Sequence, residues 1–185
     1  MAAAAQVRVR DVESGELLAS GTSGEIEIRG PSNFAGYWND AAATAEAIRA
    51  DGFFRTGDIG RLRGDGTFVY ETRRGDAMRL GGFLVSPLEV EDALKQLPGI
   101  ADVQVVAIEI AGQARSVAFV IPGSERLREA EILAAAGRRL AAFKVPARVW
   151  FVEEFPTTQS ANGVKIQRGK LREMAMARLE EGKAA

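Results

Sequence analysis

The sequence predicts an α+β fold: a partial small β-barrel or sheet subdomain, followed by a compact α+β domain with a mixed sheet and flanking helices. Three observations predict this fold. The 185 residues suffice for one large domain or two small ones. Apolar and charged residues alternate with period two in the first seventy residues, as in half-buried strands. Strand and helix patterns then alternate through the second half.

The first half is predicted to contain short strands and one helix. Asn39-Asp40 can cap the helix, because a side-chain oxygen there accepts from the first free backbone N–H groups. Gly64-Asp65-Gly66 indicates a hairpin turn, because Asp and Gly tolerate positive φ. The predicted elements are strands over 7–10 and 25–29, a helix over 41–50, and strands over 59–63 and 67–72.

A domain boundary is predicted directly after residue 72. The segment from Thr72 to Asp76 is polar and charged, and Gly75 stands near its centre. A linker this short acts as a hinge, because glycine can absorb a large change in φ and ψ. We therefore expect a first subdomain over 1–72, a hinge over 73–76 and a second domain over 77–185.

The second domain is predicted to alternate strands and helices. Ser86-Pro87 and Glu89 are typical of a helix start, and Pro98-Gly99 ends that helix. We expect the helices to cover one side of the sheet. The remaining elements are antiparallel strands over 103–110 and 116–121 around Ala111-Gly112-Gln113, a helix over 129–140, a strand over 148–152, a polar loop over 156–163 and a helix over 168–181.

Composition excludes several kinds of chemistry. The net charge of -1 provides no basic field for nucleic acid or anionic membranes. The absence of Cys and His removes disulfides, thiolate nucleophiles, His-based triads and the usual metal ligands, and we predict no metal site. No stretch is apolar enough to span a membrane, and residues 1–6 do not resemble a secretion signal. We expect a cytoplasmic protein.

Four short segments could carry function, and each has a plainer interpretation. Thr56-Gly57-Asp58 is typical of a simple turn, although Asp58 could accept hydrogen bonds from a vicinal diol. Gly81-Gly82 could be a bulge or a point of close ligand approach. Arg73-Arg74 is more often a solvated pair than a phosphate clamp. Lys165 in its polar loop is either an ordinary surface residue or a mobile point charge.

Taken in order, these segments resemble the C-terminal third of the adenylate-forming (AMP-binding) enzyme superfamily, acyl-CoA synthetase type. The resemblance covers nearly the whole chain, and the ordered series is far more specific than any single member. The matching motifs are Gly24 to Pro31 with Gly36-Tyr37-Trp38-Asn39, Asp51 to Asp58, Arg73 to Gly82, Val85 to Glu91, Phe143-Lys144-Val145-Pro146, and Pro156 to Arg168.

The resemblance implies a role for each matched residue. Asp58 and Arg73 are implied to bind the nucleotide near its ribose, and Lys165 to stabilise charge while a carboxylate attacks the α-phosphate. Gly82, with Gly81, is implied to lie beside the pantetheine tunnel of CoA. The hinge would comprise Arg74, Gly75 and Asp76. The implied cofactors of the parent enzyme are ATP/AMP, CoA and Mg²⁺.

Four departures from the family pattern accompany the resemblance. Gly75 stands where the family usually carries Asp or Lys, Thr72 replaces a Gly, and the loop over 160–164 is longer than usual. The family's phosphate loop and acyl pocket have no counterpart in the chain. We therefore expect the C-terminal portion of a longer ligase, inactive alone, that binds no cofactor tightly by itself.

The partner implied by the resemblance is the missing N-terminal domain of the same enzyme. Fatty, alicyclic and aromatic acids all remain open as substrates, because the residues that select the acid are absent. Strands from residue 7 to residue 72 would expose apolar surface, so we expect self-association. A non-catalytic interaction module, or a split-enzyme subunit that docks on a partner chain, is the alternative function.

Overall fold

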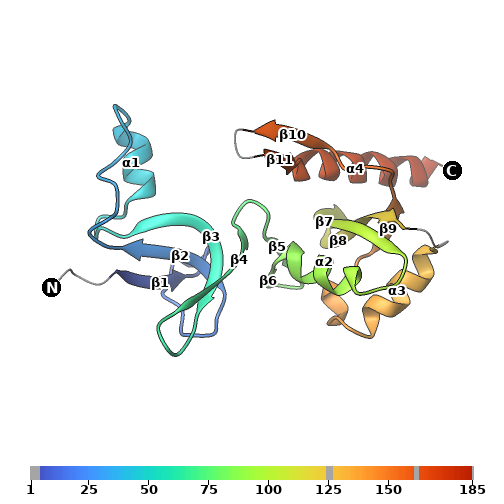
Figure 1. Cartoon of the computed structure of the whole chain (residues 1–185), viewed down its shortest axis with the longest axis horizontal. Coiled ribbons are helices and arrows are strands. Elements are labelled where there is room, and N and C mark those ends of the chain that lie inside the picture. Colours follow the sequence, from blue (N-terminus) through green and yellow to red (C-terminus); the bar gives the residue numbers. More distant parts are fainter. Residues whose placement is uncertain (1–4, 124–126, 161–162, 185) are drawn as a thin grey trace. The chain divides into compact units, whose positions relative to one another are not determined.

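The computed structural model describes residues 5–123, 127–160 and 163–184 (Figure 1). Its backbone divides into two compact units, Met1–Ala77 and Met78–Ala185. The α+β fold class is confirmed, since both units combine helices with sheets. Within the described residues, no helix has the length and apolar character needed to cross a bilayer.

The first unit is built on an open, four-stranded antiparallel sheet in the order β1-β2-β3-β4. The sheet does not close into a barrel, so the sheet alternative of the prediction is the one observed. One short helix connects the second strand to the third. The elements are β1 (Gln6–Arg10), β2 (Gly24–Arg29), α1 (Ala41–Ala47), β3 (Phe54–Leu62) and β4 (Phe68–Arg73).

Period-two alternation explains this sheet. Val9, Ile26 and Ile59 come from three neighbouring strands, and all are buried. The predicted cap of α1 is confirmed, because the Ala43 N–H donates to the Asp40 carboxylate at 2.8 Å. The helix ends at Ala47, three residues before the predicted end, since the next residue is already extended and bridges to Phe54.

A buried carboxylate organises the other face of the first unit. The side chain of Glu27 is fully buried, yet it receives three guanidinium groups. Arg8 Nε lies 2.6 Å from Glu27 Oε2, Arg10 Nε lies 3.3 Å from Oε1, and Arg49 also donates to Oε1. Burial alone would raise the pKa of Glu27, but the hydrogen bonds from the arginines outweigh it and lower this pKa.

The second unit contains the remaining helices and strands. Its sheet has the order β7-β8-β9, in which β7 and β8 are antiparallel and β8 and β9 are parallel. The elements are β5 (Met78–Leu80), β6 (Phe83–Val85), α2 (Pro87–Lys95), β7 (Ile100–Ile110), β8 (Gln113–Pro122), α3 (Glu129–Gly137), the 3₁₀ turn η1 (Ala142–Lys144), β9 (Arg148–Phe151), β10 (Thr157–Ser160), β11 (Gly163–Ile166) and α4 (Arg168–Ala184).

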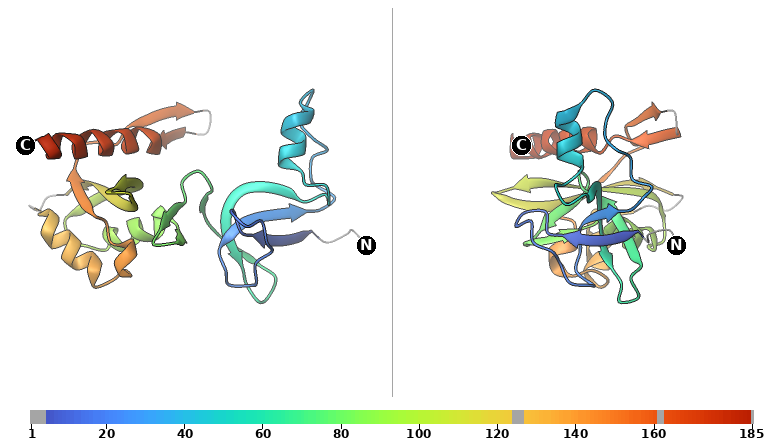
Figure 2. Two further views of the ribbon diagram at one scale, coloured as in Figure 1. Left: turned by 180° about the vertical axis from the view of Figure 1, so that it is seen from behind. Right: turned by 90° about the vertical axis from the view of Figure 1, so that its left-hand side faces the viewer.

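Helices cover both faces of this sheet, which corrects the prediction of helices on one side (Figure 2). Val103 and Val105 of β7 pack with α2 and α3 in one buried cluster. Val106 and Phe119 belong to a second cluster with Leu171 of α4. Adjacent strand residues point to opposite faces, and β7 carries apolar residues on both. A strand that is apolar on both faces requires cover on both.

Two hairpins in the second unit differ from the predictions. The segment 156–163, predicted as a polar loop, contains β10, which pairs with β11 in antiparallel register. Its Ala161 and Asn162 lie outside the described residues. Gly81-Gly82, left open as a bulge or a ligand contact, joins β5 to β6. The β10–β11 segment is polar, which weakens the hydrophobic pattern from which strands are predicted. The strands β5 and β6 have three residues each, which is too short to show a period.

Replacing Glu27 tests the arginine cluster. A carboxylate whose pKa is lower in the folded state stabilises the fold at pH values above its pKa in the unfolded state. This stabilisation is lost as the pH falls through the pKa of the folded state. Glu27→Gln is therefore expected to lower the free energy of unfolding at pH 7 by about 1–3 kcal/mol. The difference should shrink below about pH 4.5. Urea unfolding of both proteins at pH 7 and at a pH below about 4.5 measures this difference.

Glu46→Gln serves as the control for this prediction, because Glu46 is exposed on α1. It should change the free energy of unfolding by no more than about 0.5 kcal/mol. An equal effect of the two substitutions at pH 7, or a Glu27→Gln effect that does not depend on pH, would contradict the assigned role of the cluster.

Candidate functional site

Asp58 and Arg73, which are distant in sequence, are direct cross-strand neighbours. The register of β3 against β4 pairs them, and Arg73 Nη1 lies 2.8 Å from Asp58 Oδ1. Asp58 is partly covered, whereas the side chain of Arg73 is 65% exposed. A carboxylate beside a solvent-facing guanidinium can bind a hydroxyl group and an anionic group at once, although Asp58 Oδ1 itself is buried.

The backbone of β3 determines where Asp58 lies. Thr56-Gly57-Asp58 is part of this strand and is not the simple turn of the plainer interpretation. Gly57 has a φ of 70°, in the region that favours glycine. The Asp58 N–H donates to Thr56 Oγ1 at 3.0 Å, and that hydroxyl donates to the carbonyl of Ile26 at 2.8 Å. These bonds fix the backbone from which the Asp58 side chain extends.

Residues 74–76, the predicted hinge, form a turn that closes on the end of β4. The N–H groups of Asp76 and Ala77 both donate to the carbonyl of Arg73 at 3.0 Å. Arg74 Nη1 lies 3.2 Å from Glu25 Oε2. At Gly75, a Cβ would meet no described atom within 4 Å. The turn is thus anchored at its first residue and uncrowded at its glycine.

Gly81 and Gly82 form the two-residue turn between β5 and β6. Their φ angles of 57° and 86° match the turn type that twists with a β-hairpin. The turn borders a hollow of about 490 Å³, which Arg79, Arg115 and Phe143 also line. A glycine edge beside two guanidinium groups suits a narrow ligand that carries negative charge.

Packing and an ion pair hold the aromatic side of this hollow in place. The rings of Phe83 and Phe143 stack with their centroids 4.9 Å apart. Next to them, Lys144 Nζ lies 2.5 Å from Glu89 Oε1 of α2. The sequence did not predict the residues that line or support this hollow, namely Arg79, Arg115 and Phe83. Single surface arginines carry no sequence signal, and only the chain fold brings them to the glycine turn.

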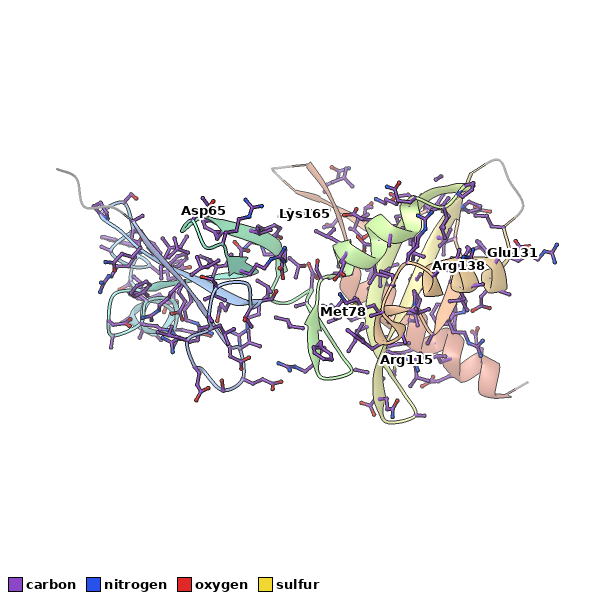
Figure 3. All side chains as sticks on the ribbon, turned by 90° about the horizontal axis from the view of Figure 1, so that it is seen from below. Asp65, Met78, Arg115, Glu131, Arg138 and Lys165 are labelled. Carbon is purple, nitrogen blue, oxygen red and sulfur yellow. The ribbon has the colours of Figure 1, made fainter. Side chains whose placement is uncertain are left out.

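Lys165 lies on β11 and is exposed (Figure 3). It pairs in register with Thr158 of β10, so it stands on a strand and not in the predicted loop. Among the residues that the structure describes, no carboxylate forms an ion pair with it. An exposed ammonium group in this setting can contact an external anion. Lys165 belongs to the second unit, and Asp58 and Arg73 belong to the first.

Comparison with known proteins gives consistent matches. Residues 89–162 match the model of the AMP-binding enzyme C-terminal domain. The 2,3-dihydroxybenzoate-AMP ligase of Bacillus subtilis is 40% identical over 177 residues, which cover 94% of this chain and 31% of that protein. Feruloyl-CoA synthase of an Amycolatopsis species is 37% identical over 161 residues, covering 86% of this chain and 32% of the relative.

Solved structures agree with these relatives. The crystal structure of ATP-bound MatB from Rhodopseudomonas palustris superposes with a TM-score of 0.80 at 34% identity, over 92% of this chain and 34% of that one. The chain thus spans about a third of the length of the proteins that it matches.

Alanine substitutions test how far the Gly81-Gly82 turn depends on glycine at each position. A Cβ in the left-handed region costs about 1–2 kcal/mol, so Gly81→Ala and Gly82→Ala should both destabilise the chain. At Gly81 the new Cβ would also lie 3.1 Å from the Cβ of Phe143, whereas no described atom lies within 4 Å at Gly82. Gly81→Ala is therefore expected to lower the urea midpoint further.

Gly137→Ala is the matched control, because Gly137 ends α3 without a positive φ or a close described neighbour. It should leave stability unchanged or raise it by up to about 1 kcal/mol. An equal or smaller loss at Gly81 than at Gly82 would show that the contact with Phe143 does not restrict the turn.

Proposed function

Because the chain belongs to the adenylate-forming (AMP-binding) enzyme superfamily, we propose that it is the C-terminal portion of an AMP-forming acid–CoA ligase. The overall reaction would convert a carboxylate, ATP and CoA to an acyl-CoA, AMP and pyrophosphate. The chain would contribute the ribose-binding carboxylate, the hinge and the adenylation lysine. The observation that carries this proposal is the pairing of Asp58 with Arg73 across β3 and β4, inside a match to acid ligases that covers 94% of the chain.

Asp58 would accept hydrogen bonds from the ribose hydroxyls of ATP and AMP. Its carboxylate is partly exposed and is held by the Thr56 hydroxyl through the backbone, so it is oriented before a ligand arrives. Arg73, which is largely exposed, would contact the nucleotide beside it. Charge-assisted hydrogen bonds of this kind are about twice as strong as neutral ones.

Lys165 would act in the first half-reaction. A carboxylate oxygen of the acid attacks the α-phosphorus of ATP, the bond from that phosphorus to the pyrophosphate oxygen breaks, and pyrophosphate leaves with the electron pair. No proton has to move, so a chain without His can support this step. An ammonium group near the reacting oxygens offsets the charge that develops on them.

The Gly81-Gly82 turn would act in the second half-reaction. The sulfur of CoA attacks the acyl carbonyl carbon, the bond from that carbon to the AMP oxygen breaks, AMP leaves with the electron pair, and the thiol proton passes to water. A glycine edge leaves room for the pantetheine arm, and Arg79 and Arg115 offer cations to its phosphates. Rotation at residues 74–76 would exchange the Lys165 face for the Gly82 face between the half-reactions.

Other parts of the proposal concern the parent enzyme. It would bind Mg²⁺ with ATP, but within the described residues no three acidic side chains gather as a metal site, and we name no ligands. Fatty, alicyclic and aromatic acids all remain open as substrate classes. The enzyme would be cytoplasmic, and its N-terminal domain would be the principal partner. Alone, the chain would bind nucleotide weakly and give no acid-dependent exchange of pyrophosphate into ATP.

A fused enzyme tests the proposal. The preceding two-thirds of the Amycolatopsis feruloyl-CoA synthase, which matches this chain at 37% identity, are joined to the full chain and supplied with ferulate, Mg-ATP and CoA. Lys165→Ala is expected to lower ferulate-dependent ATP–pyrophosphate exchange by about 10²–10³-fold. Asp58→Asn should lower it by roughly tenfold or more, since it weakens charged hydrogen bonds.

Glu46→Gln is the control in the fused enzyme and should retain full exchange, because Glu46 lies exposed on α1. Full exchange by Lys165→Ala would overturn the assigned role of that residue. Robust exchange by the isolated chain would contradict its proposed dependence on an N-terminal domain.

The alternative is a non-catalytic module, or a split-enzyme subunit, that docks on a partner chain. Exposed aromatic residues in the first unit favour some docking: Trp38 is 98% exposed, and it lines a hollow of about 570 Å³ with Tyr37 and Ile48. Mixing the chain with a separate N-terminal portion of the feruloyl-CoA synthase separates the cases. Restored activity supports the split enzyme, whereas binding without activity supports the module.

Self-association is expected through the same unit. Phe68 and Tyr70 lie two residues apart on the edge strand β4, so they share a face, and they are 42% and 49% exposed. Phe68→Ser/Tyr70→Ser should weaken association at least about tenfold, or 1.4 kcal/mol, in light scattering. Val164→Ser, at a 61% exposed position of the second unit, is the control. A chain that stays monomeric at all concentrations would contradict the expectation.

A further inference from the structure

Arg168, three residues after Lys165 in the chain, forms a buried ion pair with Glu91. Arg168, the first residue of α4, extends its guanidinium to Glu91 of α2, with Nη1 2.8 Å from Oε1 and Nη2 3.2 Å from Oε2. The Glu91 side chain is 2% exposed and that of Arg168 is 14% exposed. The pair is therefore bidentate and largely removed from solvent, which is the strong form of an arginine–carboxylate contact.

The same two side chains also bind the backbone of the central sheet. Arg168 Nη1 donates to the carbonyl of Val105 at 2.7 Å, and the Val105 N–H donates to Glu91 Oε1 at 2.8 Å. One residue of β7 thus has both its backbone polar groups bound by the pair. Three elements meet at this point: α2, β7 and the start of α4. We call these contacts the Arg168–Glu91 clasp.

The base of the hairpin that carries Lys165 is held beside the clasp. The backbone N–H of Gln167 donates to the carbonyl of Pro156 at 2.8 Å, and its side chain donates to the carbonyl of Thr157 at 3.1 Å. Leu171, one turn into α4, is fully buried. Gly163, Val164 and Lys165 themselves are exposed. The orientation of the exposed residues of β11 therefore depends on how the base of the hairpin is held.

We propose that the Arg168–Glu91 clasp positions Lys165 for the adenylation step. This inference rests on the proposed function, in which Lys165 must reach the α-phosphate. Lys165 is separated from Arg168 by about 10 Å of extended chain, so a small rotation at the base displaces its ammonium group by a similar or larger amount. A displacement of about 1 Å can lower a rate about 10²-fold. Arg168 and Glu91 are positioning residues that touch no substrate.

A purely structural role is the competing explanation, because removing one partner leaves a buried charge unpaired. The double variant E91Q/R168Q removes both charges together and can retain a hydrogen bond between the two amides. We expect this variant to keep the domain folded, where R168Q alone can fail to fold. R168K, which keeps the charge but loses the planar fork, is the conservative variant.

The test measures the two half-reactions separately in the fused enzyme with the feruloyl-CoA synthase portion. Adenylation is followed as ferulate-dependent ATP–pyrophosphate exchange, and thioester formation is followed from supplied feruloyl-AMP and CoA. E91Q/R168Q is expected to lower adenylation by 10- to 100-fold and to leave thioester formation within about threefold of the unsubstituted enzyme. R168K should be intermediate, and K170Q, an exposed substitution in the same helical turn, should be unchanged.

Hydrogen exchange of the isolated full chain gives a second measurement that needs no activity. In E91Q/R168Q the amides of β10 and β11 should exchange at least tenfold faster, whereas those of β7 and β8 away from Val105 should retain their protection. Unchanged exchange in the hairpin overturns the proposal. Equal loss of protection across the sheet also overturns it, since that shows a general structural role.

The failures of the two proposals can be distinguished. If K165A abolishes adenylation while E91Q/R168Q does not lower it, the clasp proposal is wrong and the proposed function stands. Equal loss of both half-reactions in E91Q/R168Q also overturns the clasp proposal, because Lys165 is needed in only one. If K165A leaves adenylation intact, the proposed function itself fails.

Discussion

A carboxylate that is removed from water needs cationic partners, and each unit of this chain contains at least one such group. In the first unit Glu27 lies between Arg8, Arg10 and Arg49. In the second unit Glu91 binds Arg168. Losing one partner of such a pair destabilises the fold, because a buried charge is left without compensation. The ion pair therefore holds together the strands and helices that carry its residues.

This constraint bears on the use of arginine in the chain. Guanidinium groups remain charged under all ordinary conditions and bind carboxylates through two parallel hydrogen bonds. Arg168 uses that geometry to join α4 to α2 and β7. Lys165, by contrast, is exposed on β11, and the described part of the chain offers it no carboxylate. Arg168 thus holds elements of the fold together, whereas Lys165 is the group of this region that we propose to act on a ligand.

Both proposed working surfaces of the second unit lie on hairpins, outside the three-stranded central sheet. The Gly81-Gly82 turn needs positive φ at both positions, and the β10–β11 hairpin presents Lys165 on an exposed strand. The sheet between them is packed on both faces. A rigid, doubly covered sheet with two short exposed hairpins suits a domain that would present one surface and then another to the same ligand.

The sequence alone determined the fold class, the strand alternation of the first unit, the Asp40 cap of α1 and the turn between β7 and β8, because each depends on local pattern or on residues adjacent in the chain. It also marked Asp58, Arg73 and Lys165 as candidates, and their roles stay predictions. Only the tertiary structure decided that helices cover both faces of the sheet, that the 156–163 segment belongs to a hairpin, and that Arg168 meets Glu91. The physical reason is that Arg168 and Glu91 are 77 residues apart: no local spacing encodes a contact between them, and burial makes it favourable only once three elements have packed together.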